Sequence, residues 1–93
     1  MCGFIGKLSY DIIDVNSLEI CNSYIECRGP DSKVVRSSSS ELLKYCFIFN
    51  RLSILDLAEN ANQPMVDSFS GNILMFNGEI FNHEELRKYL IKK

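Results

Sequence analysis

The sequence lacks an excess of charge of either sign and lacks a long apolar segment. Its 93 residues include 10 Lys or Arg and 12 Asp or Glu, a formal net charge of −2, so it has no basic signature of a nucleic-acid-binding protein. Apolar runs such as residues 45–49 are far shorter than the roughly 20 residues that cross a bilayer. No basic region precedes a sustained apolar core at the N-terminus, which argues against a signal peptide. We therefore expect a cytoplasmic protein.

The pattern of a metal site is also missing. The four cysteines, at positions 2, 21, 27 and 46, form no Cys-x-x-Cys pair, and the single histidine, His83, lies 37 residues beyond the last of them. Zinc sites need close ligand pairs, so we predict no metal in this chain. Without a secretory signal, free thiols in a reducing compartment are expected.

What is present is the composition of a globular protein, with 46% hydrophobic and 24% charged residues. A chain this short buries a modest fraction of its surface and is often marginally stable alone. It also ends within or just after a helical pattern, at residues 90–93. We therefore treat residues 1–93 as one unit without an internal boundary and expect it to be part of a larger domain.

The apolar periodicity predicts a mixture of strands and helices in which the strands outnumber the helices. Strands are predicted at residues 2–8, 42–49 and 72–76, and the serine run at 37–40 is predicted to be a solvated turn. The strand at 42–49 is apolar on both faces, which is typical of a strand buried between two layers.

Two helices are predicted from capping-box pairs, in which a polar N-cap residue is followed three positions later by Glu. The first begins at Asn16 with Glu19, places Leu18, Cys21 and Ile25 on its apolar face, and ends near residue 27, before Gly29-Pro30. The second begins at Asn82 with Glu85, and its apolar face holds Leu86, Tyr89 and Leu90.

Cys2 is a candidate nucleophile. Removal of Met1 would place a free α-amino group, with a pKa near ~8, on the same residue as the thiol. The neutral amine can take the thiol proton, directly or through a water, and later protonate a leaving group. The alternative is a small buried residue near the terminus.

Three further segments carry polar groups at turns or strand ends: residues 28–32 (Arg-Gly-Pro-Asp-Ser), 51–57 (Arg-Leu-Ser-Ile-Leu-Asp-Leu) and 77–79 (Asn-Gly-Glu). Each alone is commonly a turn, a solvated arginine or a hairpin. Together they contain the parts to hold a free amino acid and attack its side-chain amide. Arg51 would clamp the carboxylate, Glu79 the ammonium group, and Asn77 with Gly78 the oxyanion formed by attack of Cys2.

The motif order resembles that of the N-terminal class II glutamine amidotransferase domain of glutamine-hydrolysing asparagine synthetases. The similarity runs from Cys2 to about Arg87 and comprises, in order, Met-Cys-Gly-Phe-Ile-Gly, Arg-Gly-Pro-Asp, Arg-Leu-Ser-Ile-Leu-Asp-Leu, Gln-Pro-Met, Asn-Gly-Glu-Ile-Phe-Asn and Glu-Leu-Arg. Other class II amidotransferases share the Cys-Gly start but are not expected to carry the later set together. The resemblance is therefore specific.

The resemblance implies an α+β fold, the αββα sandwich of N-terminal-nucleophile hydrolases, of which about the first half is present. Cys2 would attack the amide of L-glutamine, release ammonia and form a thioester that water hydrolyses. Asn77 and Gly78 correspond to the oxyanion-hole pair. The implied glutamine-binding residues are Arg51, Leu52, Ser53, Ile54, Leu55, Asn77, Gly78 and Glu79.

The resemblance also implies partners outside this chain. The remaining half of the domain would supply a further aspartate for the substrate ammonium group, and a synthetase domain would amidate aspartate with ATP and Mg²⁺. We expect no cofactor in residues 1–93, and a homo-oligomer is possible. Family members usually have histidines at the positions of Cys27 and Phe49, a difference that affects local hydrogen bonding rather than the nucleophile.

Several readings stay open from the sequence. The chain is the glutaminase portion of an asparagine synthetase-like enzyme, a truncated or split-gene fragment without activity by itself, or the amidotransferase domain of a relative that amidates sugars or antibiotic precursors. A small interaction module unrelated to amide chemistry fits the length but leaves the joint occurrence of the motifs unexplained.

Overall fold

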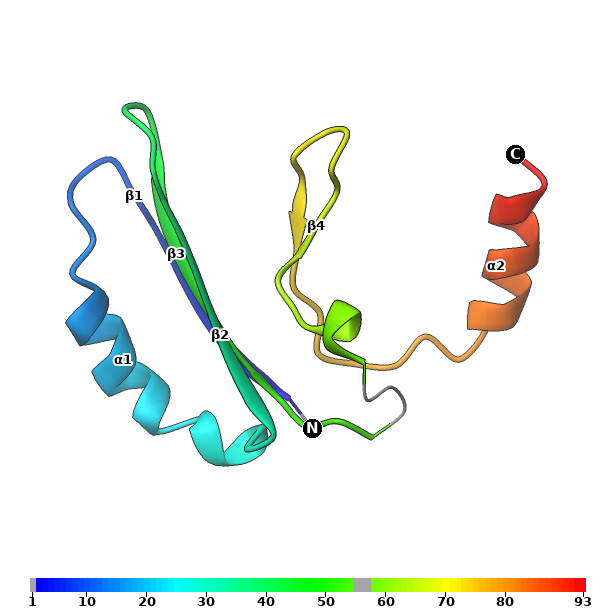
Figure 1. Cartoon of the computed structure of the whole chain (residues 1–93), viewed down its shortest axis with the longest axis horizontal. Helices are drawn as coiled ribbons and strands as arrows, with labels where there is room; N and C mark the ends of the chain where they lie inside the picture. The colour runs from blue at the N-terminus through cyan, green and yellow to red at the C-terminus, as the bar shows by residue number, and fades with distance from the viewer. Residues whose placement is uncertain (1, 55–57) are drawn as a thin grey trace.

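The centre of the structure, a computed structural model that describes residues 2–54 and 58–93, is a three-stranded antiparallel sheet. Its strand order is β1 (Gly3–Ser9), β3 (Lys44–Arg51), β2 (Ser32–Ser39). Helix α1 (Val15–Ser23) and the 3₁₀ turn η1 (Glu26–Arg28) connect β1 to β2 and lie along one face of the sheet (Figure 1). The predicted mixture of strands and helices is confirmed, and the chain is a small α+β unit.

The second half of the chain has shorter strands and extends away from the three-stranded sheet (Figure 1). It contains the 3₁₀ turn η2 (Glu59–Ala61), a short antiparallel hairpin of β4 (Met65–Val66) and β5 (Ile73–Leu74), and helix α2 (His83–Ile91). No helix in the described ranges is long and apolar enough to span a membrane.

Strand β3 is the central strand because it pairs on both sides along its whole length. Its partners run from Gly3↔Asn50 to Ser9↔Lys44 in β1 and from Ser32↔Arg51 to Ser39↔Lys44 in β2. Cys46, Ile48 and Phe49 are at most 1% exposed. The predicted buried strand is thus confirmed, although it begins two residues later than predicted because Leu42 and Leu43 belong to the preceding turn.

The hydrophobic core lies between α1 and the sheet. Leu18 of α1 packs with Cys46 and Ile48 of β3, and Ile5 and Ile13 flank this cluster. On the opposite face of the sheet the aromatic rings of Phe4 and Phe49 stack with centroids 6.3 Å apart. The core is small, as expected for a chain of this length.

The N-cap of helix α1 lies two residues before the predicted one. The N-cap is Asp14, not Asn16, because the Asp14 carboxylate accepts hydrogen bonds from the Asn16 amide at 3.0 Å and the Ser17 hydroxyl at 2.5 Å. The Ser17 bond, followed by those of the helix-terminal amides, lowers the pKa of Asp14. A carboxylate at the helix start outweighs the neutral amide that the capping-box pattern favoured.

The end and the buried face of α1 also differ from the prediction. The helix ends at Ser23, whose hydroxyl donates to the Ile20 carbonyl at 2.7 Å, rather than near residue 27. Cys21, predicted to face the core, is exposed, whereas Asn22 is buried. Apolar spacing missed this polar residue because its burial depends on a partner in another element.

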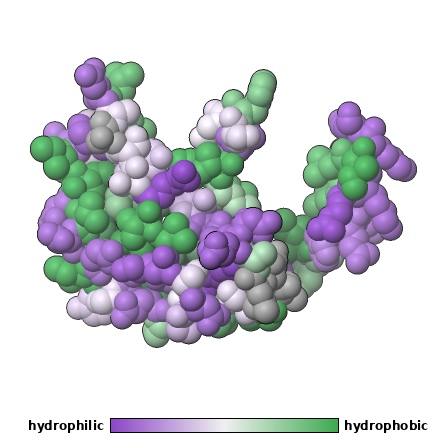
Figure 2. All heavy atoms as spheres, viewed as in Figure 1, coloured by the Kyte–Doolittle hydropathy of each residue, from purple (hydrophilic) through white to green (hydrophobic). Residues whose placement is uncertain are grey.

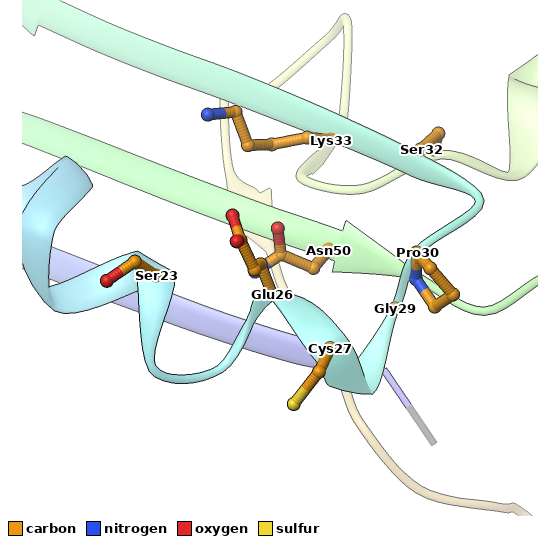
Figure 3. A pocket seen from close by; sticks show the side chains of 8 residues that line it. All are labelled: Ser23, Glu26, Cys27, Gly29, Pro30, Ser32, Lys33 and Asn50. Atoms are coloured by element: carbon orange, nitrogen blue, oxygen red, sulfur yellow. The ribbon is translucent and has the colours of Figure 1, made fainter.

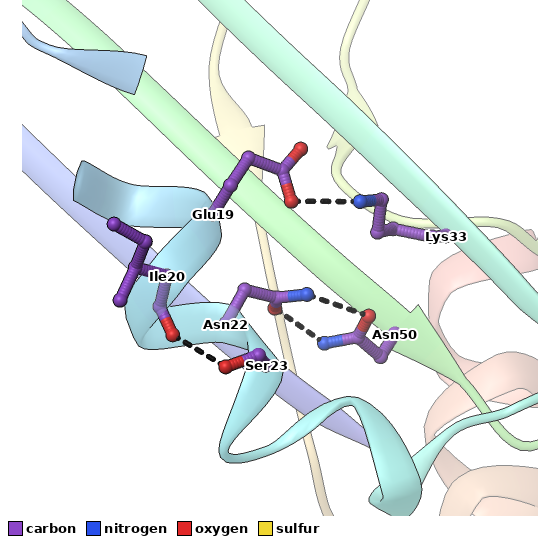
Figure 4. A network of polar contacts seen from close by, with 6 residues as sticks. All are labelled: Glu19, Ile20, Asn22, Ser23, Lys33 and Asn50. Atoms are coloured by element: carbon purple, nitrogen blue, oxygen red, sulfur yellow. Dashed lines mark hydrogen bonds and ion pairs between the residues drawn. The ribbon is translucent and has the colours of Figure 1, made fainter. Parts of the chain in front are cut away.

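That partner is Asn50 of β3 (Figure 4). The two side-chain amides donate to each other, with the Asn22 nitrogen 3.3 Å from the Asn50 oxygen and the Asn50 nitrogen 2.7 Å from the Asn22 oxygen. Both side chains are 1% exposed. The reciprocal pair satisfies polar groups that would otherwise destabilise the core and fixes α1 against the end of β3.

The serine run at 37–40 was predicted to be a turn, and this is wrong. Ser37 and Ser38 belong to β2, where they pair with Cys46 and Tyr45. The turn lies at residues 40–43 and is closed by Ser40, whose hydroxyl donates to the Leu43 carbonyl at 2.6 Å. Pairing with the strongly apolar β3 outweighs the weak strand preference of serine on an edge strand.

The last two predicted elements are confirmed in type but not in detail. The strand predicted at 72–76 is limited to β5. Helix α2 follows Asn82, as predicted, but the Asn82 side chain makes no capping hydrogen bond, so the expected capping box is wrong. Leu86, Tyr89 and Leu90 are 43–67% exposed, and the apolar face of α2 is therefore open to solvent.

Exposed apolar side chains are spread over the face seen in Figure 2 and come from both halves of the described chain. They include Phe69 and Phe81, which are 99% and 91% exposed, and Phe4 and Leu8 on the sheet. The Cα radius of gyration is 15.1 Å, against about 12 Å for a compact domain of this length. The described residues therefore leave much of their apolar surface unburied.

We predict that Asn22→Ala lowers the free energy of unfolding by about 1–3 kcal/mol, because it leaves the buried Asn50 amide without its partner. Urea unfolding followed by circular dichroism measures this change. The matched control is Asn16→Ala, an exposed amide on the same helix, with an expected change within about 0.5 kcal/mol. Equal effects of both substitutions would contradict a stabilising role of the pair.

We also predict that the isolated chain self-associates, because exposed apolar surface and the edge strands β1 and β2 of the three-stranded sheet favour contact between copies. Sedimentation velocity should show species heavier than the monomer, increasing with concentration. A monodisperse monomer at all concentrations would contradict this prediction.

Candidate functional site

The predicted nucleophile, Cys2, lies beside the C-terminal end of β3. The pairing of Gly3 with Asn50 brings the start of β1 to this position. The Leu52 amide donates to the Cys2 Sγ at 3.4 Å, and the thiol donates to the Leu52 carbonyl at 3.8 Å. Cys2 is half-buried, so its sulfur is held in place while part of the residue stays accessible.

The other cysteines have different surroundings. Cys21 and Cys27 are exposed, and Cys46 is buried in the core. Burial, with a smaller contribution from the charge of Glu19, raises the pKa of the Cys46 thiol. Since the thiolate is the reactive form, Cys46 is suited to packing rather than to attack on a substrate.

The Arg-Gly-Pro-Asp segment, which begins at the last residue of η1, holds the two strands that meet at Cys2. The Arg28 Nε donates to the Cys2 carbonyl at 3.3 Å. The Asp31 amide donates to the Arg51 carbonyl at 3.0 Å, and the Asp31 carboxylate accepts from the Ser53 amide at 2.6 Å. The sequence pattern alone is typical of a local turn, whereas the Asp31 carboxylate binds the amide of a residue 22 positions away.

Gly29 allows this close approach. A Cβ atom at this position would lie 2.2 Å from the Asn50 carbonyl oxygen and 2.6 Å from the Arg51 nitrogen, both of them backbone atoms. No side chain can be accommodated there without moving the end of β3. The glycine therefore has a packing role beside the candidate site.

Arg51, the predicted carboxylate ligand, is the last residue of β3 and is 8% exposed. Its Nη1 donates to the Ala58 carbonyl at 2.8 Å and to the Asn62 Oδ1 at 2.9 Å. These bonds hold the guanidinium in a fixed position. Binding of a substrate carboxylate by Arg51 stays a prediction.

The residues that follow Arg51 lie at different depths. Leu52 and Ser53 are half-buried, and Ile54 is 72% exposed. The predicted binding residue Leu55 lies outside the described residues, as do residues 56 and 57. Leu52 and Ser53 therefore form, with Cys2 and Arg51, the part of the site that the structure brings together.

Asn77, Gly78 and Glu79, the other predicted part of the site, are exposed in the segment between β5 and α2. Among the described residues, no hydrogen bond joins them to Cys2 or to residues 51–54. The segment is anchored just before Asn77, at Phe76, by the side chain of Gln63. Asn62 and Gln63 were not predicted as site residues, although the Gln-Pro-Met motif marked this loop in the sequence.

A separate hollow of about 430 Å³ lies on the α1 side of η1 and β3 (Figure 3). None of the predicted site residues lines it; its lining consists of Ser23, Glu26, Cys27, Gly29, Pro30, Ser32, Lys33 and Asn50. Beside it, Lys33 forms an ion pair with Glu19 at 2.7 Å (Figure 4). The hollow is therefore distinct from the Cys2 site.

Metal ligands do not cluster in the described ranges 2–54 and 58–93. No group of three or more His, Cys, Asp or Glu side chains is arranged there to hold a metal ion. The chemistry available near Cys2 consists of a thiol, backbone amides and a guanidinium, which suits nucleophilic attack on an amide or ester.

Comparison with known proteins identifies relatives of similar kind. The chain is 42% identical over 66 residues to asparagine synthetase [glutamine-hydrolyzing] 2 of Bacillus subtilis (strain 168), which covers 71% of this chain and 8% of the relative. It is 41% identical over 94 residues to asparagine synthetase [glutamine-hydrolyzing] 2 of Lotus japonicus, which covers 97% of this chain and 15% of the relative. It is 31% identical over 93 residues to asparagine synthetase B [glutamine-hydrolyzing] of Escherichia coli (strain K12), and this match covers 94% of this chain and 15% of the relative.

The chain thus spans about one sixth or less of the length of these relatives. No solved structure matches it significantly. The sequence profile described as "Glutamine amidotransferase domain" matches residues 1–93, the whole chain. The resemblance stated from the motifs is confirmed, and the chain belongs to the glutamine amidotransferase domain family.

Proposed function

We propose that this chain is the glutaminase portion of an asparagine synthetase-like enzyme, which hydrolyses L-glutamine to glutamate and ammonia. The observation that carries the proposal is the position of Cys2: its Sγ lies 3.4 Å from the Leu52 nitrogen, at the end of the strand that also carries Arg51. The family membership and the glutamine-hydrolysing relatives support it.

The reaction begins at Cys2 once Met1 has been removed. The neutral α-amine of Cys2 takes the thiol proton, and the sulfur attacks the side-chain carbonyl carbon of glutamine. The oxygen becomes negatively charged in the tetrahedral intermediate and is stabilised by the Asn77 side-chain amide and the Gly78 backbone N–H. The C–N bond then breaks, the nitrogen takes up the proton from the amine and leaves as ammonia, and a γ-glutamyl thioester remains.

Water completes the cycle. The amine of Cys2 takes a proton from the attacking water, the C–S bond breaks, and glutamate leaves while the thiol regains its proton. Arg51 binds the α-carboxylate of glutamine throughout, and Glu79 binds its ammonium group. The remaining contacts with the substrate are made by residues 52–55, which are Leu52, Ser53, Ile54 and Leu55.

We propose further that residues 1–93 are part of an αββα sandwich, with the rest of the domain covering the exposed apolar face of the sheet. ATP and Mg²⁺ act in a synthetase domain outside this chain, where ammonia amidates aspartate. The cytoplasm is the proposed compartment, since the thiol of Cys2 must stay reduced. Association into a homo-oligomer is compatible with the exposed apolar surface.

We predict that Cys2→Ala abolishes ammonia release from L-glutamine, because it removes the proposed nucleophile. An electrophilic glutamine analogue should add one adduct to the unsubstituted chain, at Cys2, after loss of Met1. Intact mass spectrometry, with excess glutamine as competitor, measures both events.

The matched control for labelling is Cys27→Ala, which removes an exposed thiol and should leave the adduct unchanged. Hydrolysis retained in Cys2→Ala would refute the nucleophile. A processed chain that takes up no adduct would instead identify residues 1–93 as an inactive portion of the domain.

We predict that Arg51→Lys raises the KM for glutamine by about 10-fold or more with a small change in kcat, because it removes the two-point contact with the carboxylate but keeps the charge. The α-carboxylate does not take part in the reaction, so an arginine that binds it stabilises the ground state and the transition state equally. Steady-state kinetics measure the two constants. A fall in kcat at unchanged KM would assign Arg51 another role.

A further inference from the structure

We propose that Gln63 is a positioning residue for the oxyanion-binding segment Asn77–Gly78, held in place through the neighbouring Asn62 and Arg51. The inference rests on the proposed function, since it concerns the same site. It assigns a role to the Gln-Pro-Met motif, which the proposed reaction does not otherwise use.

Gln63 binds both backbone groups of Phe76. Its Nε2 donates to the Phe76 carbonyl at 3.0 Å, and its Oε1 accepts from the Phe76 amide at 2.6 Å. A primary amide offers a donor and an acceptor side by side, which is the same pair that a neighbouring strand offers in a sheet. Strand β5 ends at Leu74, and Gln63 thus continues the pairing of the chain beyond the strand.

Packing joins Phe76 to Gly78, two residues further along the chain. A Cβ atom at Gly78 would lie 2.8 Å from the Phe76 ring, so the ring covers the glycine closely. Fixing the backbone of Phe76 therefore restricts the start of the segment that carries the two proposed oxyanion donors, the Asn77 side chain and the Gly78 amide. Within residues 2–54 and 58–93, the hydrogen bonds of the Gln63 side chain go to Phe76 and not to these two groups.

Asn62 fixes the other end of the connection. Its Oδ1 accepts from Arg51 Nη1 at 2.9 Å and from the Ser32 hydroxyl at 3.2 Å. Asn62 and Gln63 are adjacent in sequence, so the loop that contacts Arg51 at the end of β3 also contacts the residue before Asn77. The side-chain amides of Asn62 and Gln63 thereby connect Arg51, which is proposed to bind the substrate carboxylate, to the proposed oxyanion-binding segment.

The test compares the full unsubstituted chain with Gln63→Met, which keeps the side-chain length but removes both hydrogen bonds. Amide exchange at Phe76 should become about 10-fold faster. The kcat for glutamine hydrolysis should fall roughly 10- to 100-fold, because oxyanion donors act mainly in the transition state and small displacements weaken them strongly. The KM for glutamine should stay within about 3-fold, since Arg51 keeps its other bonds.

Two further variants separate positioning from general stability. Asn60→Leu removes an exposed amide in the adjacent turn η2 and should leave Phe76 exchange, kcat and KM unchanged. Gln63→Glu keeps the acceptor for the Phe76 amide but places a carboxylate against the Phe76 carbonyl. Its kcat should lie between those of the unsubstituted chain and Gln63→Met, and it provides a second measurement if Gln63→Met does not fold.

Unchanged Phe76 exchange in Gln63→Met would overturn the proposal, and so would faster exchange with unchanged kcat. An increase in KM that accounts for the whole loss of kcat/KM would assign Gln63 a structural role only. If the unsubstituted chain hydrolyses no glutamine, residues 1–93 are an inactive portion of the domain by themselves. Faster Phe76 exchange in Gln63→Met would then still support the positioning contact, and unchanged exchange would still overturn it.

Discussion

The pairing of β3 with a strand on each side is the constraint on which the candidate site depends. The register with β1 sets Gly3 against Asn50, and the register with β2 sets Ser32 against Arg51. Cys2 and Asp31, the residues just before these partners, therefore reach the same end of β3 from opposite edges. A shift of one residue in either pairing would turn these side chains to the other face of the sheet. The contact between Cys2 and Leu52, 50 positions apart in the chain, is a consequence of this register.

Polar contacts between distant segments organise the surroundings of the site, next to a small apolar core. Asn22 with Asn50, Asp31 with Ser53, and Arg51 with Asn62 each join different segments. Individually such hydrogen bonds contribute about 0.5–1.5 kcal/mol, but they are directional and therefore fix positions that apolar packing leaves free. These hydrogen bonds gather around the C-terminal end of β3, whereas α2 and the sheet keep exposed apolar faces. Covering those faces would add hydrophobic stabilisation.

Sequence patterns were most reliable where apolar residues recur at the spacing of a strand or a helix. The strands around Cys2–Leu8 and 42–49 and the helix after Asn82 were predicted in type and approximate place. Prediction failed where a polar residue has a distant or competing partner: Asp14 replaced Asn16 as the cap, Asn22 replaced Cys21 at the core, and the serines of β2 were assigned to a turn. In the site, the motifs indicated Cys2, Arg51 and Asn77, but not the connecting role proposed for Gln63. A hydrogen bond between residues 13 positions apart leaves no periodic signal in the sequence.

The sequence by itself determined the family, because motif order and spacing are properties of the chain that need no coordinates. It also determined which residue types are available as nucleophile, cation and amide donors. The tertiary structure decided which of them meet. It placed Cys2 against Leu52 and bonded the Arg51 guanidinium to Ala58 and Asn62. Residues 77–79, which follow the Phe76 backbone bound by Gln63, are exposed. The physical reason is that strand register and side-chain hydrogen bonds act between segments far apart in the chain, whereas residue type and spacing are local.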